Sequence, residues 1–354
     1  MNRYAAQGLL ATLTALTACA HAPASSTAAP TGMPVASYVV SRQLAIAGEG
    51  RWDLLAVDAP RHHLFLSRSD HVDVVDTVTG ARVGTLAGTD GVHGIAIAPG
   101  LMRGYTTNGK SDSVTEFDLI TFARIRDIPV SGHSPDAVLF DAGSGRLFVF
   151  NAQSNNASVI DPVTGKEIAT IAFAGNPELP VADGRGHVFV NIEDKGQLVR
   201  IDAAAMKVLD TWTLAGCEEP TGLALDNAHA RLFSACHNRI MAVTDANDGH
   251  PVAQVAIEDG PDGAEFDPQR QLLFIPNGKS GSLTIVHEDD ADHFRTTQTL
   301  ATQTSARTIV LDPQMHRLYL PAARFGPQPA GSKERPPILP GSFTVLEVRS
   351  ADER

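Results

Sequence analysis

The sequence predicts an all-β chain folded as a seven-bladed β-propeller, with four antiparallel strands in each blade. Three observations predict this fold. One turn-forming position recurs seven times at intervals of 40 to 45 residues, a β-rich run follows each occurrence, and helical spacing of apolar residues is nowhere sustained. Four short strands in about 40 residues is the spacing typical of propeller blades. The recurring positions are Asp58, Ala98, Asp141, Asp183, Asp226, Asp267 and Asp312.

The other strands of each unit follow in order after this turn. Third strands end near an acidic residue, as at Asp76 and Asp161, where turn-forming residues follow. The second strands are predicted at residues 63–66, 103–106, 146–149, 187–190, 231–234, 272–275 and 317–320. Fourth strands end before glycines at which the chain passes to the next blade, at Gly88, Gly132, Gly175, Gly216 and Gly260.

The last unit begins near Ala306 and supplies only three strands. A run with the pattern of a fourth strand lies instead at residues 38–46, before the first unit. We expect this N-terminal strand to pair into the last blade, because that pairing closes the ring and removes the free sheet edges.

The repeated unit resembles that of the YVTN repeat family, which includes YncE-like periplasmic proteins and surface-layer antigens. Residues 105–108 (Tyr-Thr-Thr-Asn) and 148–151 (Phe-Val-Phe-Asn) are the closest matches to the four-letter core of that family. The third-strand turn of the family matches at residues 160–166, and its Gly-Pro-Asp sequence matches at 260–262. The resemblance covers residues 38–349 and implies a seven-bladed propeller in an exported protein.

Two segments depart from the family pattern. Cys236 and His237 stand where the family has its asparagine region, and residues 325–340 form an insert that contains five prolines. The insert could cover one mouth of the channel, form a polyproline surface for a partner, or be a tolerated surface loop. The sequence leaves these three roles open.

The N-terminal residues predict export from the cytoplasm. Residues 1–19 have the pattern of a bacterial lipoprotein signal peptide that ends in Leu-Thr-Ala-Cys, so Cys19 is the predicted lipidation site. Residues 20–36 are predicted to be a flexible tether, and residues 37–350 the propeller. We therefore expect a periplasmic protein tethered to the outer membrane through its lipid anchor only, with cleavage to a free periplasmic protein as the alternative.

The net charge and the cysteine content limit the classes of binding partner and the cellular compartment that we expect. The formal net charge of -12 argues against nucleic acid as a partner. We expect a monomer that binds an envelope protein or a small ligand. Cys217 and Cys236 remain as a pair once Cys19 is lipidated, and an oxidising compartment favours a disulfide between them. The alternative is a soft-metal site made by both thiols and His237.

Candidate ligand-binding residues come from the leading positions of the innermost strands, which line the channel mouth in propellers. Imidazole and carboxylate groups in such a ring could coordinate a divalent metal or act in general acid–base chemistry. The alternative is that they cap strands and solvate a water-filled channel. The predicted ligand-binding set is His93, His133, Asp136, Glu178, Glu218, Asp262 and Arg307, and similar leading positions are held by Trp52, Asp53, Glu219 and Glu265.

Other recurring residues have a structural interpretation. Asn108, Asn151 and Asn277 each end a second strand, where asparagine is a turn former. Together these observations favour a cell-envelope binding or scaffold propeller of the YncE-like type. The alternative is a metal-dependent hydrolase or lactonase that uses the channel histidines and carboxylates. No catalytic residue and no cofactor is predicted, except that the ring could hold a divalent metal.

Overall fold

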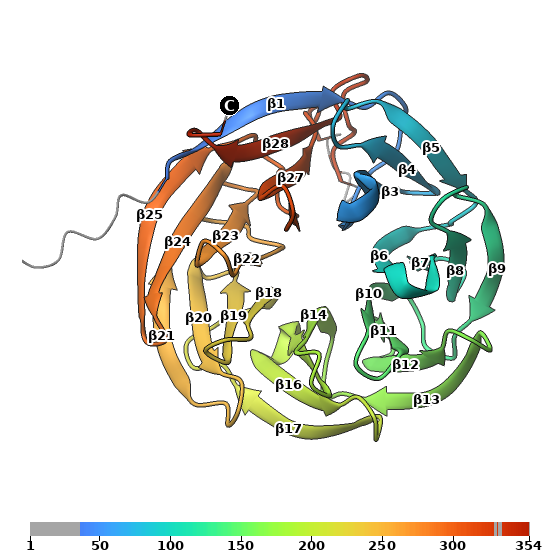
Figure 1. Ribbon diagram of the computed structural model, residues 1–354, viewed down its shortest axis with the longest axis horizontal. Coiled ribbons are helices and arrows are strands. Elements are labelled where there is room, and N and C mark those ends of the chain that lie inside the picture. The colour runs from blue at the N-terminus through green and yellow to red at the C-terminus, as the bar shows by residue number, and fades with distance from the viewer. Residues whose placement is uncertain (1–35, 329–330, 332–334, 354) are drawn as a thin grey trace, which may run out of the picture. The chain divides into compact units, whose positions relative to one another are not determined.

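Seven four-stranded antiparallel sheets form a closed ring around a central channel (Figure 1). This computed structural model describes residues 36–328, 331 and 335–353. Each sheet is one blade, and its strands run in chain order from the channel to the rim in six of the seven blades. The predicted fold class, with four antiparallel strands per blade, is confirmed.

Strand bounds repeat closely from blade to blade in the two inner layers. The innermost strands are β2 (Leu55–Asp58), β6 (Val92–Ala98), β10 (Pro135–Asp141), β14 (Pro177–Ala182), β18 (Pro220–Asp226), β22 (Glu265–Asp267) and β26 (Val310–Asp312). The second strands are β3 (His63–Arg68), β7 (Arg103–Asn108), β11 (Arg146–Asn151), β15 (His187–Ile192), β19 (Arg231–Cys236), β23 (Leu272–Asn277) and β27 (Arg317–Ala322). All seven predicted second strands are found.

The two outer layers complete the blades. The third strands are β4 (His71–Asp76), β8 (Ser113–Asp118), β12 (Asn156–Asp161), β16 (Gln197–Asp202), β20 (Ile240–Asp245), β24 (Ser282–Asp290) and β28 (Thr344–Ser350). The rim strands are β5 (Arg82–Ala87), β9 (Arg124–Pro129), β13 (Lys166–Ala172), β17 (Lys207–Thr213), β21 (Pro251–Ala256), β25 (His293–Ala301) and β1 (Tyr38–Ala45). Three short 3-10 helices follow inner or second strands, η1 (Ala59–Arg61), η2 (Pro99–Leu101) and η3 (Glu193–Lys195).

Burial explains why these segments form strands. Residues of the second and third strands are buried almost throughout, whereas rim strands alternate between exposed and half-buried positions, as in β17. The core lies between adjacent blades: Phe148 and Phe150 of β11 belong to one buried cluster with Val188 and Val190 of β15. Each blade therefore buries its faces against its two neighbours.

The recurring aspartates hold the turns that end the strands. After the inner strand β10, the carboxylate of Asp141 accepts hydrogen bonds from the backbone N–H groups of Gly143 and Ser144. After the third strand β12, Asp161 accepts in the same way from Val163 and Thr164. These side chain-to-backbone bonds fix the turn geometry and so set the repeat length.

The ring is closed by the N-terminal strand, as predicted. Strand β1 pairs antiparallel with β28, from Tyr38 opposite Ser350 to Ala45 opposite Thr344. The last blade thus combines three strands from the C-terminal end of the chain with one from the N-terminal part, and Figure 1 shows β1 lying along β28 at the rim. Pairing of β1 covers the edge of β28 that would otherwise be exposed.

The asparagines that end second strands have the structural role that was predicted, but inside the blade. Asn108 is buried and its Nδ2 donates to the hydroxyls of Ser113 and Thr115 on the neighbouring strand, at 3.1 and 2.9 Å. Asn277 makes the equivalent bonds to Ser282 and Thr284. These amides therefore join second and third strands and do not form a binding surface.

Some sequence predictions fall outside this structure. Cys19 and the predicted signal and tether up to residue 35 lie outside the described residues, so lipidation and export stay predictions. Within the described ranges, no helix has the length and apolar character needed to cross a bilayer.

Candidate functional site

One residue from each blade lies at the same repeat position and faces the channel mouth. Counting back five positions from the turn that ends each inner strand gives Asp53, His93, Asp136, Glu178, Thr221, Asp262 and Arg307. Two adjoining cavities of about 400 and 230 Å³ open at this level, and Arg307 lines both of them. We call these seven residues the mouth ring.

Arg307 links two carboxylates of the mouth ring. Its Nε lies 2.5 Å from Asp262 Oδ2, and its Nη2 lies 2.9 Å from Asp53 Oδ1. Because these residues come from the sixth, seventh and first blades, the guanidinium bridges the segment where the ring is closed. The positive charge of Arg307 is therefore already paired with Asp53 and Asp262 within the protein.

His93 occupies the opposite side of Asp53. Its Nδ1 lies 2.6 Å from Asp53 Oδ2 and 3.6 Å from Asp136 Oδ1. Ligating atoms of these three residues all lie within 4.8 Å of one another. Two carboxylates and one imidazole so placed are a set of donors that a divalent metal accepts.

The far side of the mouth carries acidic groups that pair with no lysine or arginine among the described residues. Glu178 accepts a hydrogen bond from Asn176 Nδ2 at 3.1 Å, and the same amide nitrogen donates to Glu193 at 2.9 Å. Across the described part of the chain, no lysine or arginine pairs with Glu178 or with Asp136. Glu219 is paired with His237, whose Nδ1 lies 2.9 Å from its carboxylate.

Burial raises the pKa values of three carboxyl groups in the mouth ring. Burial, with the charge of Asp53 adding to it, raises the pKa of Asp136 to about 7. Burial and the carboxylates of Asp136 and Asp262 raise the pKa of Glu178 to about 10. Burial also raises the pKa of Asp262 to about 6 in spite of Arg307. For Asp53 burial acts in the same direction, but the bond to His93 and the charge of Arg307 outweigh it and lower its pKa.

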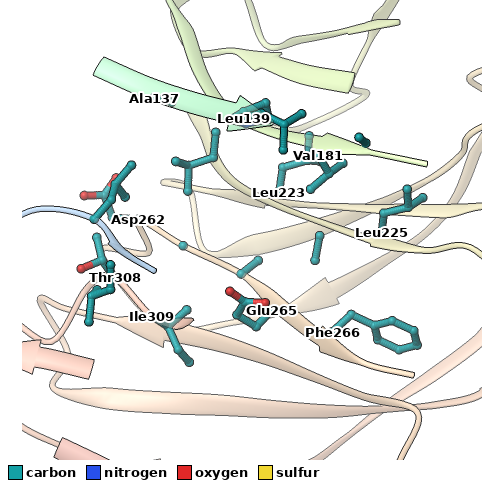
Figure 2. A pocket seen from close by; sticks show the side chains of 18 of the residues that line it. Ala137, Leu139, Val181, Leu223, Leu225, Asp262, Glu265, Phe266, Thr308 and Ile309 are labelled. Atoms are coloured by element: carbon teal, nitrogen blue, oxygen red, sulfur yellow. The ribbon is translucent and has the colours of Figure 1, made fainter. Parts of the chain in front are cut away.

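A cavity of about 380 Å³ with mostly aliphatic lining residues occupies the channel next to the mouth ring, and Asp262 lines it as well. Figure 2 shows Leu139, Val181 and Leu223 on one side of this cavity and Ile309, Glu265 and Phe266 on the other. At the repeat position of Glu265 the other blades carry only alanine, leucine or valine. Burial raises the pKa of this lone carboxyl to about 8.

The proline-rich insert borders the mouth. The Phe325 ring lines the larger mouth cavity, and its centroid lies 5.9 Å from that of Trp52. Arg51 donates to the backbone carbonyls of Arg335 and Pro336 at 3.0 and 2.9 Å. Of the three roles that the sequence left open for the insert, these contacts favour the one at the mouth of the channel over a surface loop elsewhere.

The structure does not place every predicted ligand-binding residue in this ring. His93, Asp136, Glu178, Asp262 and Arg307 share the repeat position of the mouth ring, and their role in ligand binding stays a prediction. The His133 side chain is 68% exposed and pairs with Asp112 in a loop. Glu218 is exposed and precedes the inner strand β18, with Thr221 in the ring position instead. Both residues belong to loops between blades, so their side chains start outside the channel.

Some mouth residues were missing from the predicted set. Asp53 was noted at a leading position but not selected, and Glu193 and Thr221 were not considered. A fixed count back from the turn aspartates, which the repeat already aligns, identifies Asp53 and Thr221 and excludes His133 and Glu218. Glu193 lies after β15 and reaches the mouth from a second strand, so the inner-strand repeat does not identify it.

The predicted disulfide is confirmed. Cys217 and Cys236 are bonded to each other, with their Cα atoms 5.5 Å apart. The soft-metal alternative with His237 is overturned, because both sulfurs are consumed by this bond. The bond fastens the segment before β18 to the end of β19, next to Glu219 and His237 of the mouth.

Replacing both cysteines by serine is expected to lower the free energy of unfolding by about 3 kcal/mol, because the bond closes a loop of 19 residues in the unfolded chain. Chemical denaturation of the double variant against the oxidised protein measures the difference. The reduced wild-type protein is the control and should match the variant. A loss below about 1 kcal/mol would show that the bond is not a main source of stability.

Comparison with known proteins agrees with the fold and goes no further. No model of a known protein family matches the chain, and no curated protein matches it by sequence. The structure is similar to Kuenenia stuttgartiensis hydrazine synthase, at 16% identity and a TM-score of 0.67, over 78% of this chain and 94% of that one. It is also similar to the WD40 repeats of RRP9 and to U3-55K, each at 10% identity and a TM-score of 0.73, over 87% and 86% of this chain and 97% of theirs. Fold and site thus define a seven-bladed β-propeller with an acidic channel mouth.

Proposed function

We propose that this chain is a binding propeller that takes a small organic cation at the mouth of its channel. The observation that carries this proposal is the mouth ring, where four carboxylates face one arginine and one histidine. Arg307 serves Asp53 and Asp262, which leaves Asp136 and Glu178 without a lysine or arginine among the described residues. An ammonium or guanidinium group on a ligand would supply the missing charge.

The cavity next to the mouth ring supports a ligand with an apolar part. Its volume of about 380 Å³ lies within the range of small-molecule sites. Its walls are mainly aliphatic, and Glu265 is positioned to accept a hydrogen bond from a second polar group of the ligand. A cation carrying a short hydrocarbon chain fits both the charge of the mouth and the character of the channel.

Location in the cell envelope is part of the same proposal. Export with removal of residues 1–19, lipidation of Cys19 and tethering to the outer membrane are what the sequence predicts, and the resemblance to YncE-like proteins implies the same compartment. The Cys217–Cys236 disulfide supports it, because such bonds persist in oxidising compartments. A small ligand or an envelope protein presenting a basic side chain would meet the mouth there.

A metal-dependent hydrolase or lactonase is the second candidate function. It is favoured by the Asp53, His93 and Asp136 donor set, whose ligating atoms are within 4.8 Å of one another. A divalent ion held there could activate a water molecule next to the other carboxylates. Uptake of Zn²⁺, Mn²⁺ or Ca²⁺ that is abolished by Asp136→Asn, together with ester or lactone hydrolysis, would favour this candidate over the first.

Calorimetric titration with agmatine, putrescine and choline at pH 7.5 tests the binding proposal. We expect at least one of these amines to bind, and 1,4-butanediol, the uncharged counterpart of putrescine, not to bind. Replacing Asp136 by Asn should weaken amine binding about tenfold or more, because Asp136 is mainly ionised at pH 7.5 and a hydrogen bond to a charged group contributes about 1.5–3 kcal/mol. Failure of all three amines, or equal binding of the diol, would contradict the proposal.

Two controls separate the mouth from general surface charge. Glu218→Gln removes an acidic group outside the mouth ring and should leave amine affinity unchanged. Amine affinity should also rise between pH 5.5 and pH 8, because Asp262 and Asp136, with pKa values of about 6 and 7, lose their protons over this range. Affinity that falls with rising pH would indicate a different site.

A further inference from the structure

A second group of ligating side chains lies at the other end of the inner strand β18. Thr221 of the mouth ring and Asp226 are five residues apart on this strand, a separation of about 16 Å at the rise of an extended chain. Asp226 ends β18, and His229 follows in the turn before β19. Glu288 reaches them from the third strand β24 of the next blade. Two blades therefore contribute to this group.

The three side chains converge on one nitrogen. Nδ1 of His229 lies 2.7 Å from Asp226 Oδ2 and 3.3 Å from Glu288 Oε1. The ligating atoms of the three residues are all within 4.8 Å of one another. Both carboxylates are buried, whereas the His229 side chain is 35% exposed. The group is thus closed on the protein side and reachable from solvent past the imidazole.

Glu288 is the member that the protein itself leaves unsatisfied. Its exposed fraction is 0%, and its Oε2 is buried without a hydrogen-bond partner. An N–H at Nδ1 of His229 cannot point at both carboxylates, so it makes a good hydrogen bond to Asp226 and a poor one to Glu288. A buried carboxylate oxygen without a partner is costly, so a further group is expected at this place.

Basic side chains do not fill this need. The nearby Arg231 donates from Nη1 to Asp245 and from Nη2 to Asp292, at 2.5 and 3.1 Å. Within the described ranges, no lysine or arginine pairs with Asp226 or Glu288. His229 is therefore the basic side chain that these two buried carboxylates share.

A second aspartate–histidine pair in the same chain lies at an equivalent strand end and has no third ligand among the described residues. Asp267 ends the inner strand β22, as Asp226 ends β18, and the Nδ1 of His316 lies 2.7 Å from its carboxylate. No third acidic ligand joins that pair among the metal-ligating groups of the described residues. Glu288 is what distinguishes the group at Asp226.

We propose that Asp226, His229 and Glu288 bind a divalent first-row transition-metal ion, such as Zn²⁺ or Mn²⁺, between the fifth and sixth blades. Two carboxylates and an imidazole suit these ions better than Ca²⁺ or Mg²⁺, which prefer oxygen ligands throughout. The ion replaces the proton on Nδ1 of His229. It is also coordinated by Oε2 of Glu288, the oxygen that has no hydrogen-bond partner in the described part of the chain. Three protein ligands leave a coordination position for water on the exposed side of His229.

Metal titration of the purified full-length protein tests this site. The protein carries no affinity histidines, is stripped with a chelator, and is titrated with ZnCl₂ and with MnCl₂ in a calorimeter. We expect one equivalent of at least one ion to bind and to raise the melting temperature, because an ion that binds only the folded state stabilises it. Glu288→Gln should weaken this equivalent at least about tenfold, as loss of a charged ligand does.

Three further variants make the result specific. His229→Asn changes a partly exposed turn residue and should also lose the ion, which covers the case in which Glu288→Gln does not fold. His316→Asn, in the pair without a third ligand, should keep it. Asp136→Asn should keep it too, which separates this site from any metal at the mouth ring.

Several outcomes would overturn the assignment. No uptake of either ion by the wild-type protein would leave a proton between Glu288 and Asp226 as the group in the pocket. Uptake that survives both Glu288→Gln and His229→Asn would place the ion elsewhere. An equivalent lost in Asp136→Asn but kept in Glu288→Gln would assign it to the mouth. The first two results leave the amine-binding proposal unaffected, whereas a metal at the mouth would favour the second candidate function.

Discussion

A chain shortened to begin at Gly48, and therefore lacking strand β1, is expected to lose cooperative folding. The truncation removes the pairing of β1 with β28 and exposes the edge of the last blade. It also removes Tyr38, which is 1% exposed and packs edge-on against Phe274 with ring centroids 5.1 Å apart. Loss of one such buried aromatic side chain costs about 3–5 kcal/mol, a large part of the stability of an ordinary domain.

Thermal unfolding followed by circular dichroism measures this effect, with size-exclusion chromatography to detect aggregation. The matched control is a chain that begins at Ala36, which keeps every strand of the described residues and should melt like the full-length protein. Tyr38→Ala is the milder variant and should lower the melting temperature without abolishing the transition. A truncated chain that still unfolds cooperatively as a monomer would show that β1 is not needed to close the ring.

Asp73→Asn is expected to lower the free energy of unfolding by about 3–5 kcal/mol, because it leaves the charge of Arg68 buried without an anion. Both side chains are 0% exposed, and Arg68 Nη1 lies 3.2 Å from Asp73 Oδ2. The guanidinium also stacks over the Phe343 ring, 3.8 Å from its centroid. The remaining acceptors of Arg68 are neutral carbonyls of Gly48 and Gly50.

Chemical denaturation of Asp73→Asn and of a surface control measures the difference. Asp70→Asn is the control, since Asp70 is exposed and its pair with His71 contributes about 1 kcal/mol or less. The double variant Arg68→Met/Asp73→Leu should recover much of the loss, because it removes both charges from the interior. A loss below about 1 kcal/mol in Asp73→Asn would mean that solvent or another acceptor reaches Arg68 and compensates its charge.

Most of the fold could be predicted from the sequence because the blade repeats. Turn aspartates such as Asp141 and Asp161 accept hydrogen bonds from local backbone N–H groups, so their spacing along the chain records the size of one blade. Closure by residues 38–46 followed from the missing strand of the last unit. The disulfide followed from the number of cysteines and the expected compartment.

The candidate sites were predicted less completely, for two physical reasons. Loops between blades vary in length, so His133 and Glu218 seemed to lead their inner strands when counted from the preceding glycine. The group at Asp226 depends on contact between separate blades, which no local pattern reveals. Glu288 lies on β24, which at nine residues is longer than the six-residue third strand β20. That extension carries its carboxylate to His229, 59 residues away in sequence.

Because β1 pairs with β28, the N-terminal and C-terminal parts of the propeller meet within one blade. The backbone N–H of Ala351 donates to the carbonyl of Ser37 at 2.8 Å, so the chain leaves the last blade beside the point where it entered. A short linker could join these two points, and new termini could be opened in the turn between the third strand and the rim strand of any other blade. Each such circular permutant would contain the same seven sheets and the same mouth, but a different blade would be assembled from both ends of the chain.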